Sequence, residues 1–548
     1  MGKRQRRKKS GMGRKILDGL LHYGMIQFGA AALILYLTFD LLYETLWSLI
    51  FGDIQELFHI KDITSTRILF IIVVALWIMF YFIYLRNTLY HDKTGRSYGP
   101  DHGKYRMTYS ELVAYFHDAD NKRIPKEELP VESWKDAEGI ILGHIGKYLV
   151  KRASDGVGNL TLFSLPGGGK TTSQIIPSAM RFKGSVLCID IKGDVLNWVR
   201  KHIQRKIKIF APDNAKISCH FDPLGGIKKM DITARKAFIE NLGFALVPDE
   251  PGDNSKFFVD GGRDFWNGIS LYLLAQDINT SFMDIVNAIL NDDPFSWITR
   301  VRNSEVYEAK IFLDAYYGAN ERNISGQYKK ICDCVRPFTN GALAELLQAA
   351  DDAITPKTLD SGYDIYIEIP QDKIQMYAPV TTIIVQNFMN FFMGRPDSSS
   401  GVKVRPILML LDEFPQLHFN IETLLSAMET LRSKKVSLFL AQQSLASLSR
   451  RYGDDGCREI IDNCAYISVM SAQDPKSREF FQKLIGTRKV LNVGKSDTTN
   501  PNGNSLSKSV QQTREPVYQP EDFGNLNDRV VIVANGRYIE ADKCKCYE

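Results

Sequence analysis

The chain has 548 residues and a mass of 62.2 kDa, which at roughly 150 residues per domain allows three or four domains. Hydrophobic residues make up 44% and charged residues 24%, so a mostly disordered or fibrous chain is excluded. The net charge of +5 comes from eight lysines and arginines in residues 1–15, because without them 60 basic residues face 63 acidic ones. The eight cysteines form no C-x-x-C pair, which argues against a disulfide framework or a zinc site.

Two apolar runs near the N-terminus predict membrane helices. The first is Gly24–Leu42, and the second is Ile68–Leu85, which has 18 residues and no charge. A helix that crosses a bilayer needs about 20 apolar residues. A signal peptide fits less well, because no small-x-small cleavage pattern follows the first run. We expect a basic N-terminus (1–22) and a membrane anchor with two transmembrane helices (23–90).

The basic residues predict the orientation of this anchor. Eight precede the first run, and Arg86, Lys93 and Arg96 follow the second. The segment between the runs holds only Lys61 and Arg67 as basic residues. Since basic residues favour the cytoplasmic side, we expect both ends of the anchor in the cytoplasm, together with the large domain that follows.

The rest of the chain has the pattern of an α/β protein with a helical insertion. Ser185–Ile191 and Ile407–Leu411 are almost wholly apolar, which is typical of strands covered by helices on both faces. We assign 100–227 and 349–548 to one α/β domain and 228–348, where helical stretches dominate, to an inserted all-α domain. Residues 492–513 are rich in Asn, Ser, Gly and Thr, and we expect a mobile loop there.

A glycine loop predicts a polyphosphate site. A short apolar strand, Leu160–Leu165, leads into Pro-Gly-Gly-Gly-Lys-Thr-Thr. Glycines let backbone N–H groups surround phosphate oxygens, a lysine reaches the β- and γ-phosphates, and a hydroxyl ligates Mg²⁺. Ser164 replaces the first glycine of the usual G-x-x-x-x-G-K-[ST] pattern. The predicted ATP-binding residues are Gly167, Gly168, Gly169, Lys170, Thr171 and Thr172.

An acidic pair predicts hydrolysis of that nucleotide. Asp412 and Glu413 directly follow the strand Ile407–Leu411. The first acid would hold Mg²⁺ together with Thr171, and the second would orient and polarise the attacking water. Without the glycine loop, two acids after a strand would indicate only a solvated turn. With it, the sequence predicts an ATP hydrolase.

Further along, a third strand offers two more candidates. Val436–Ala441 precedes Gln443, and Arg432 lies on the basic helix end before that strand. An amide at a strand tip beside phosphates can sense the γ-phosphate, and an arginine can reach the nucleotide of a neighbouring subunit. Taken alone, Arg432 fits a solvated basic turn equally well.

These motifs, in this order, resemble the coupling ATPases of type IV secretion and bacterial conjugation, and the resemblance covers most of the chain. The matching segments, apart from the glycine loop, are His102–Leu112, Gly184–Asp194, Phe221–Leu224, Phe265–Trp266, Asp364–Pro370, Leu411–Phe414 and Gln443–Leu445. The departures are Ser164 and the short segment between the two apolar runs. The short segment leaves open how extensively the protein engages a periplasmic channel.

The resemblance implies a RecA-like P-loop NTPase domain with an inserted all-α domain, preceded by two transmembrane helices in a bacterial cell membrane. It implies a homo-hexamer that delivers relaxase-bound single-stranded DNA, or protein, to the secretion channel. By position, Lys170, Glu413, Gln443 and Arg432 would be catalytic, with Gln443 as the γ-phosphate sensor and Arg432 as the arginine finger. Thr171 and Asp412 would hold Mg²⁺.

Two other functions fit parts of the pattern. A cell-division-type double-strand DNA translocase would share the core but normally has more spans and a C-terminal DNA-reading domain, neither of which is evident. A receptor that recruits the DNA–relaxase complex without hydrolysis would not need Lys170, Thr171, Asp412 and Glu413. DNA-stimulated ATP hydrolysis separates these alternatives.

Overall fold

The computed structural model describes residues 138–547, apart from 146–147, 250–252, 501–502 and 535. The predicted basic N-terminus, both predicted membrane helices and the segment His102–Leu112 lie outside these residues. Within the described part of the chain, no helix is both long enough and apolar enough to cross a bilayer.

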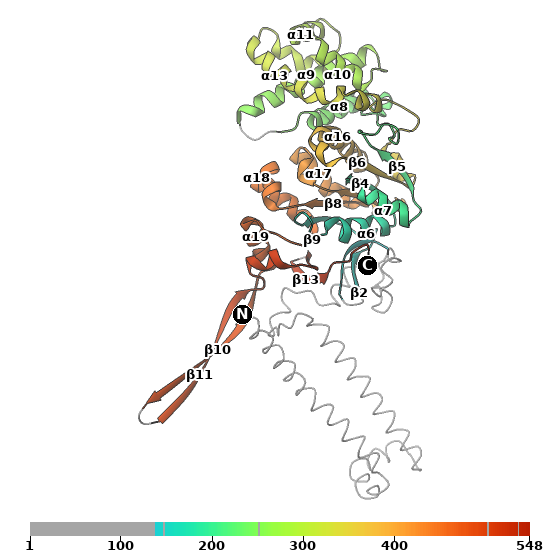
Figure 1. Ribbon diagram of the computed structural model, residues 1–548. Coiled ribbons are helices and arrows are strands. Elements are labelled where there is room, and N and C mark those ends of the chain that lie inside the picture. The colour runs from blue at the N-terminus through green and yellow to red at the C-terminus, as the bar shows by residue number, and fades with distance from the viewer. Residues whose placement is uncertain (1–137, 146–147, 250–252, 501–502, 535, 548) are drawn as a thin grey trace, which may run out of the picture. The chain divides into compact units, whose positions relative to one another are not determined.

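Most of the described strands join one mixed sheet (Figure 1). In chain order they are β1 (Ile140–Ile145), β2 (Tyr148–Arg152), β3 (Asn159–Phe163), β4 (Ser185–Ile191), β5 (Lys206–Phe210), β6 (Tyr363–Ile369), β7 (Ile407–Leu411), β8 (Val436–Gln442), β9 (Cys464–Val469), β12 (Arg529–Ala534) and β13 (Arg537–Asp542). The spatial order is β2-β1-β13-β12-β9-β3-β8-β7-β4-β6-β5. The strands from β9 to β5 are parallel, whereas β12, β13, β1 and β2 extend the sheet by antiparallel pairing.

The central parallel strands β4 and β7 are almost wholly apolar because both faces of the sheet are covered there. Leu408 and Leu410 of β7 belong to the core formed with α6 (Ile176–Arg181) and α7 (Asp194–His202). Their neighbours Ile407 and Met409 belong to the opposite core. Side chains alternate between the faces of a strand, so a strand buried on both faces needs an uninterrupted apolar run. The predicted strands Ser185–Ile191 and Ile407–Leu411 are therefore confirmed.

The second core lies under five helices from the part of the chain after residue 355. These are α15 (Pro356–Asp360), α16 (Ile374–Met393), α17 (Ile421–Thr430), α18 (Leu445–Asp462) and α19 (Pro475–Ile485). A short π-helix, η4 (Thr171–Ile175), connects the glycine loop to α6. Since the parallel strands end at one edge, the loops that follow β3, β4, β7 and β8 come together there. Open α/β sheets bind ligands at this edge.

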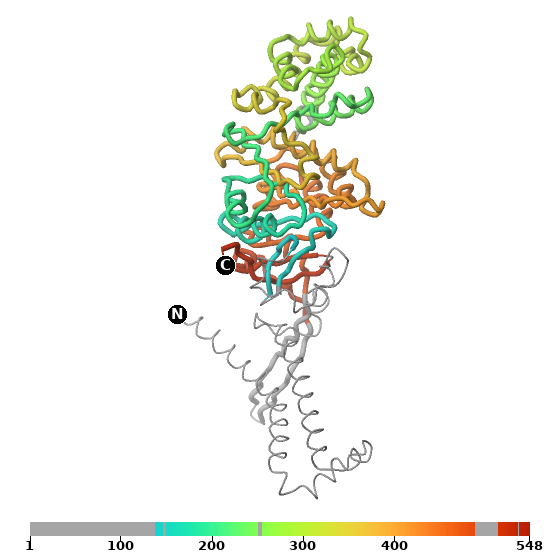
Figure 2. Tube along the Cα trace, turned by 90° about the vertical axis from the view of Figure 1, so that its right-hand side faces the viewer, coloured from blue at the N-terminus to red at the C-terminus, as the bar shows by residue number. Residues whose placement is uncertain are grey.

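Between β5 and β6 the described residues form helices and loops but no strand. The helices before α15 are α8 (Ile232–Leu246), α9 (Asp253–Gln276), α10 (Phe282–Asn291), α11 (Pro294–Arg302), α12 (Tyr307–Leu313), α13 (Glu321–Val335) and α14 (Gly341–Leu346). Phe265 and Trp266 of α9 are fully buried, and Trp266 donates to the carbonyl of Ile239 on α8 at 3.1 Å. The ribbon and tube views show that α8 lies between the sheet and the group of helices α9 to α13 (Figures 1 and 2). The predicted helical stretches in this segment are confirmed.

The expected loop at residues 492–513 is wrong. The segment belongs to a separate two-stranded sheet of β10 (Thr487–Asn500) and β11 (Gly503–Pro516), paired in register from Thr487 with Pro516 to Asn500 with Gly503. Polar composition misled the prediction, because threonine, serine and valine suit an extended ribbon and cross-strand hydrogen bonds can satisfy its backbone. An asparagine and a glycine at the strand ends also favour a tight turn.

Candidate active site

The glycine loop connects the end of β3 to η4. Gly167 and Gly169 have φ values of 74° and 88°, a region that residues with a side chain rarely adopt. Ser164, which replaces the first glycine of the usual pattern, is fully buried. A Cβ atom at Gly168 would lie 2.4 Å from the Ser164 hydroxyl oxygen. The loop therefore accommodates a serine at 164 because position 168 has no side chain.

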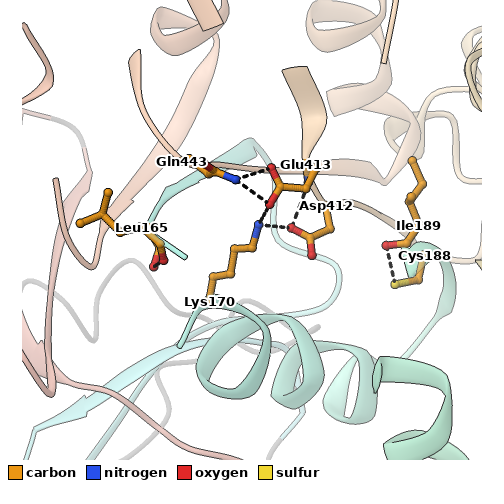
Figure 3. A network of polar contacts seen from close by, with 8 residues as sticks. Leu165, Lys170, Cys188, Ile189, Asp412, Glu413 and Gln443 are labelled. Atoms are coloured by element: carbon orange, nitrogen blue, oxygen red, sulfur yellow. Dashed lines mark hydrogen bonds and ion pairs between the residues drawn. The ribbon is translucent and has the colours of Figure 1, made fainter. Parts of the chain in front are cut away.

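Lys170 points from this loop toward the acidic pair that follows β7 (Figure 3). Its ammonium contacts a carboxylate oxygen of Asp412 at 2.9 Å and donates to the carboxylate of Glu413. The three side chains are largely shielded from solvent. The structure thus brings together two motifs that are 243 residues apart in the chain.

The backbone at the end of β7 places Asp412 and Glu413 in different surroundings. Glu413 has a φ of 49°, which is left-handed and uncommon for a residue with a side chain. The Asp412 carboxylate accepts a hydrogen bond from the Glu413 backbone N–H at 2.9 Å, which stabilises this turn. Asp412 is buried at the sheet edge, whereas Glu413 is partly exposed to the cavity. Residues with a left-handed backbone conformation concentrate at active sites. Here this conformation directs the Glu413 side chain toward Lys170.

Gln443 directly follows β8, which lies between β3 and β7 in the sheet. This strand order places its amide beside both motifs. The Gln443 Nε2 atom lies 3.2 and 3.3 Å from the two carboxylate oxygens of Glu413 and donates to them. Glu413 therefore accepts hydrogen bonds from both Lys170 and Gln443 (Figure 3).

Burial and charge act in opposite directions in this cluster. Burial raises the pKa of Asp412, and the nearby Lys170 offsets only part of this increase. Burial by itself lowers the pKa of Lys170, but the charges and hydrogen bonds of Asp412 and Glu413 outweigh it, and the net shift is upward. Lys170 is therefore a permanent cation near neutral pH.

These residues line one cavity of about 570 Å³. Of the predicted residues, it is lined by Gly167, Gly169, Lys170, Thr171, Thr172, Asp412, Glu413 and Gln443. Its lining includes four acidic side chains and two lysines. An anionic nucleotide would meet a net negative lining, so binding together with a divalent cation is favoured. The Asp412 carboxylate and the Thr171 hydroxyl are oxygen donors of the kind that suits Mg²⁺.

Two predicted residues lie outside the cavity lining. Gly168 belongs to the glycine loop but does not line the cavity, and its N–H donates to the carbonyl of Leu165 at 2.9 Å. Arg432 is exposed on the short helix Leu431–Lys434, which precedes β8. It therefore lies at the opposite end of β8 from Gln443. Within one subunit, the structure does not bring Arg432 to the cluster.

The sequence interpretation missed several residues of the cavity wall. Lys192 follows β4 and has a left-handed φ of 89°. Gln371, Gln375 and Gln416 come from the segments after β6 and β7. Gln375 and Gln416 bond to each other through their side-chain amides. Only Lys192 carried a usable clue, because a Lys-Gly pair follows an apolar strand.

Comparison with solved structures supports the fold. The conjugative coupling protein TrwB aligns with a TM-score of 0.58 at 15% identity, over 76% of this chain and 91% of that one. A complex of TrwB with the ATP analogue ADPNP aligns with a TM-score of 0.57 at 15% identity, over 75% of this chain and 91% of that one. At such low identity the likeness establishes the α/β fold with its mixed sheet and nothing finer.

Curated relatives are distant and longer. The type IV secretion system-coupling protein VirD4 of Bartonella henselae is 20% identical over 367 residues, which is 64% of this chain and 56% of that protein. The conjugal transfer protein TraG of Agrobacterium fabrum is 23% identical over 403 residues, which is 68% of this chain and 58% of that protein. The chain thus spans little more than half the length of these relatives.

A family model described as type IV secretory system conjugative DNA transfer matches residues 120–548. This match includes the whole described region, with the glycine loop, the acidic pair and Gln443. It extends well beyond half of the chain, and the relatives named for coupling and conjugal transfer agree with it. The chain therefore belongs to the type IV secretory system conjugative DNA transfer family.

Proposed function

We propose that the protein is a membrane-anchored ATPase that couples relaxase-bound single-stranded DNA, and protein as a second cargo, to a type IV secretion channel during conjugation. Membership of the conjugative DNA transfer family supports the pathway. The cavity geometry supports the ATPase activity. One observation carries the proposal: the ammonium of Lys170, from the glycine loop, contacts both Asp412 and Glu413 in the wall of one cavity.

The contacts of Lys170 explain how a triphosphate would activate the site. In the structure, Lys170 and Gln443 both donate to Glu413, so this carboxylate has its oxygens occupied. The phosphates of ATP would compete for the same ammonium, because a polyphosphate carries more charge than one carboxylate. Lys170 would then turn toward the phosphates and release Glu413.

The released carboxylate supplies the base for hydrolysis. A water oxygen attacks the γ-phosphorus, the bond to the β-phosphate oxygen breaks, and ADP and phosphate leave. Glu413 accepts the proton of the water, and Gln443 contacts the terminal phosphate. Asp412 and Thr171 would hold Mg²⁺, which would neutralise charge on the phosphates. Complexes of TrwB with an ATP analogue and with ADP and Mg²⁺ show these ligands in a protein of the same fold.

The remaining features complete a motor model. We assign residues 100–227 and 349–548 to a RecA-like domain and 228–348 to an inserted all-α domain. Residues 23–90 anchor the chain in the bacterial cell membrane, with the large domain in the cytoplasm. Arg432, exposed at the opposite end of β8, acts in trans on the nucleotide of the next subunit in a hexameric ring.

The test is conjugative transfer from donor cells whose only copy of the gene carries Lys170→Ala. We expect transfer to be abolished while the variant accumulates in the membrane fraction as the wild type does. Lys201→Ala is the matched control, because Lys201 is an exposed lysine of α7 and does not line the cavity. Transfer by Lys170→Ala at near wild-type frequency would contradict the motor and favour a recruiting receptor.

A further inference from the structure

Lys543 is a buried lysine that contacts the glycine loop but does not line the cavity. It directly follows β13, and only 7% of its surface is exposed. Its Nζ atom donates to the carbonyl of Gly168 at 2.7 Å and to the carbonyl of Asn527 at 2.6 Å. Burial of an ammonium is costly unless hydrogen bonds compensate it, so these two bonds fix where the side chain lies. Burial also lowers the pKa of Lys543.

The segment that follows Lys543 makes a second contact with the same loop. The N–H of Cys546 donates to the carbonyl of Thr172 at 2.8 Å. The contacts at Gly168 and Thr172 therefore flank Gly169, Lys170 and Thr171, which all line the cavity. Residues 543–546 come from the antiparallel extension of the sheet, 375 residues beyond Gly168 in the chain.

The bond to Gly168 determines which way one peptide group points. In a trans peptide, the C=O of one residue and the N–H of the next point in opposite directions. Neither Gly168 nor Lys543 lines the cavity, so we infer that the carbonyl bound by Lys543 faces away from it and that the Gly169 N–H faces the opposite way. Gly169 itself lines the cavity. The bond thus presents this N–H for an anion.

The loop needs such an external contact because its glycines do not fix their own conformation. A peptide group between two glycines rotates at little cost, since no Cβ atom restricts either neighbour. Gly168 and Gly169 form a pair of this kind. A phosphate nest, however, requires successive N–H groups to point inward together. A neighbouring side chain that binds one carbonyl can select the orientation that glycine leaves open.

We propose that Lys543 is a positioning residue of the nucleotide site, which holds the Gly168–Gly169 peptide with its N–H facing the bound phosphates. This inference rests on the proposed nucleotide hydrolysis and adds a residue that the motifs do not contain. Lys543 does not line the cavity, so it acts through the loop backbone rather than through the reacting atoms.

The proposal predicts a specific kinetic change. Without Lys543, the Gly168–Gly169 peptide would populate two orientations. The apparent affinity for ATP would then fall in proportion to the fraction of molecules in the binding-competent orientation. Nucleotide binding itself selects the competent orientation, so saturating ATP restores the active loop. KM should therefore rise about tenfold, while kcat should stay within about twofold of the wild type. A defect in folding would instead lower kcat, because fewer molecules would be active.

The experiment measures ATP hydrolysis against ATP concentration for the purified full-length chain and three variants. Lys543→Met removes the ammonium, Lys543→Arg keeps a cationic donor, and Lys545→Met removes the same charge two residues away. Lys545 pairs with Asp528 at 2.9 Å and is the matched control. We expect the raised KM in Lys543→Met only, with Lys543→Arg recovering most of the affinity. Thermal unfolding without nucleotide checks that Lys543→Met is folded.

A Lys543→Met KM within twofold of the wild type, or a fall in kcat at unchanged KM, would overturn the positioning role. If the wild type hydrolyses ATP, either of these two results for Lys543→Met leaves the proposed function intact. Loss of hydrolysis in the wild type itself would overturn the proposed function and this inference together. An equal rise of KM in Lys545→Met would also count against it, because general charge rather than the Gly168 bond would then set the affinity.

Discussion

At the scale of single residues, the proposed mechanism makes the contacts of Glu413 the feature that determines when hydrolysis begins. Its carboxylate receives donors from Lys170 and Gln443, and its left-handed backbone places it over the cavity. A base engaged in this way cannot accept a proton from water until a donor leaves. Under the proposed function, the phosphates of ATP would be the competing acceptor for Lys170, so hydrolysis would be coupled to binding.

The change Glu413→Gln separates binding from hydrolysis. The amide keeps the shape of the side chain but cannot act as a base, so we expect the hydrolysis rate to fall by about 10²- to 10⁴-fold. Affinity for ATP should be unchanged or higher, because one negative charge is removed from the cavity lining. Single-turnover hydrolysis and equilibrium binding of a fluorescent ATP analogue measure the two effects. Hydrolysis at half the wild-type rate would exclude Glu413 as the base.

The sequence was sufficient for residues whose role depends on local order along the chain. Lys170, Asp412 and Glu413 follow apolar strands at fixed spacings, and the structure brings them together as predicted. Lys543 and Lys192 could not be predicted in this way, because their positions depend on how distant strands are paired. No local pattern indicates that a lysine after the final strand contacts a loop hundreds of residues earlier.

At the scale of elements, a buried acid near the end of β4 stabilises the start of α7. The Asp190 carboxylate accepts from the N–H groups of Leu196 at 2.7 Å and Val195 at 3.3 Å, in the first turn of α7. Burial raises the pKa of Asp190 to about 6, although these two bonds lower it, and Glu368 and Asp194 add to the increase. The turn from β4 to α7 carries Lys192 into the cavity wall, so its rigidity affects the site.

Asp190→Asn tests this element through the pH dependence of stability. The native pKa lies above the unfolded value of 3.8, so the contribution of Asp190 is fully present below pH 3.8 and is lost as the pH rises through about 6. The loss amounts to roughly 3 kcal/mol for the wild type and does not occur with asparagine. We expect the melting temperature of the variant, relative to the wild type, to rise between pH 4.5 and pH 7. Parallel pH profiles would show that Asp190 does not titrate in this range.

Other elements were only partly accessible from sequence. The strands Ser185–Ile191 and Ile407–Leu411 and the helical character of the segment between β5 and β6 were predicted, because apolar runs and helical periodicity report burial directly. The pair β10–β11 was missed, since its sequence is rich in Asn, Ser, Gly and Thr and shows no regular apolar alternation. Composition alone does not distinguish such a ribbon from a loop.

At the scale of the whole molecule, the catalytic proposal requires a second subunit. Gln443 and Arg432 lie at opposite ends of β8, so one subunit does not bring both to the same phosphate. An arginine that acts on a neighbour must be exposed, as Arg432 is. The proposed hexamer would place this arginine against the cavity of the next chain.

Mixing two inactive variants tests the action in trans. Arg432→Ala subunits retain an intact cavity, and Glu413→Gln subunits retain an intact arginine. Mixed rings should therefore contain some interfaces with both groups, and we expect partial recovery of ATP hydrolysis that peaks near equal proportions. Analytical ultracentrifugation confirms that rings form. Absence of recovery at every ratio, in confirmed rings, would contradict a finger supplied by the neighbour.

The proposed function requires that one bound ATP is held by Lys170, hydrolysed with Glu413, and consumed in moving DNA. The most direct measurement is the rate of ATP hydrolysis by the purified full-length chain with and without single-stranded DNA, beside Lys170→Ala. We predict hydrolysis by the wild type that increases several-fold with DNA and is abolished by Lys170→Ala. No hydrolysis by the wild type in either condition, or hydrolysis by Lys170→Ala at the wild-type rate, would contradict the account.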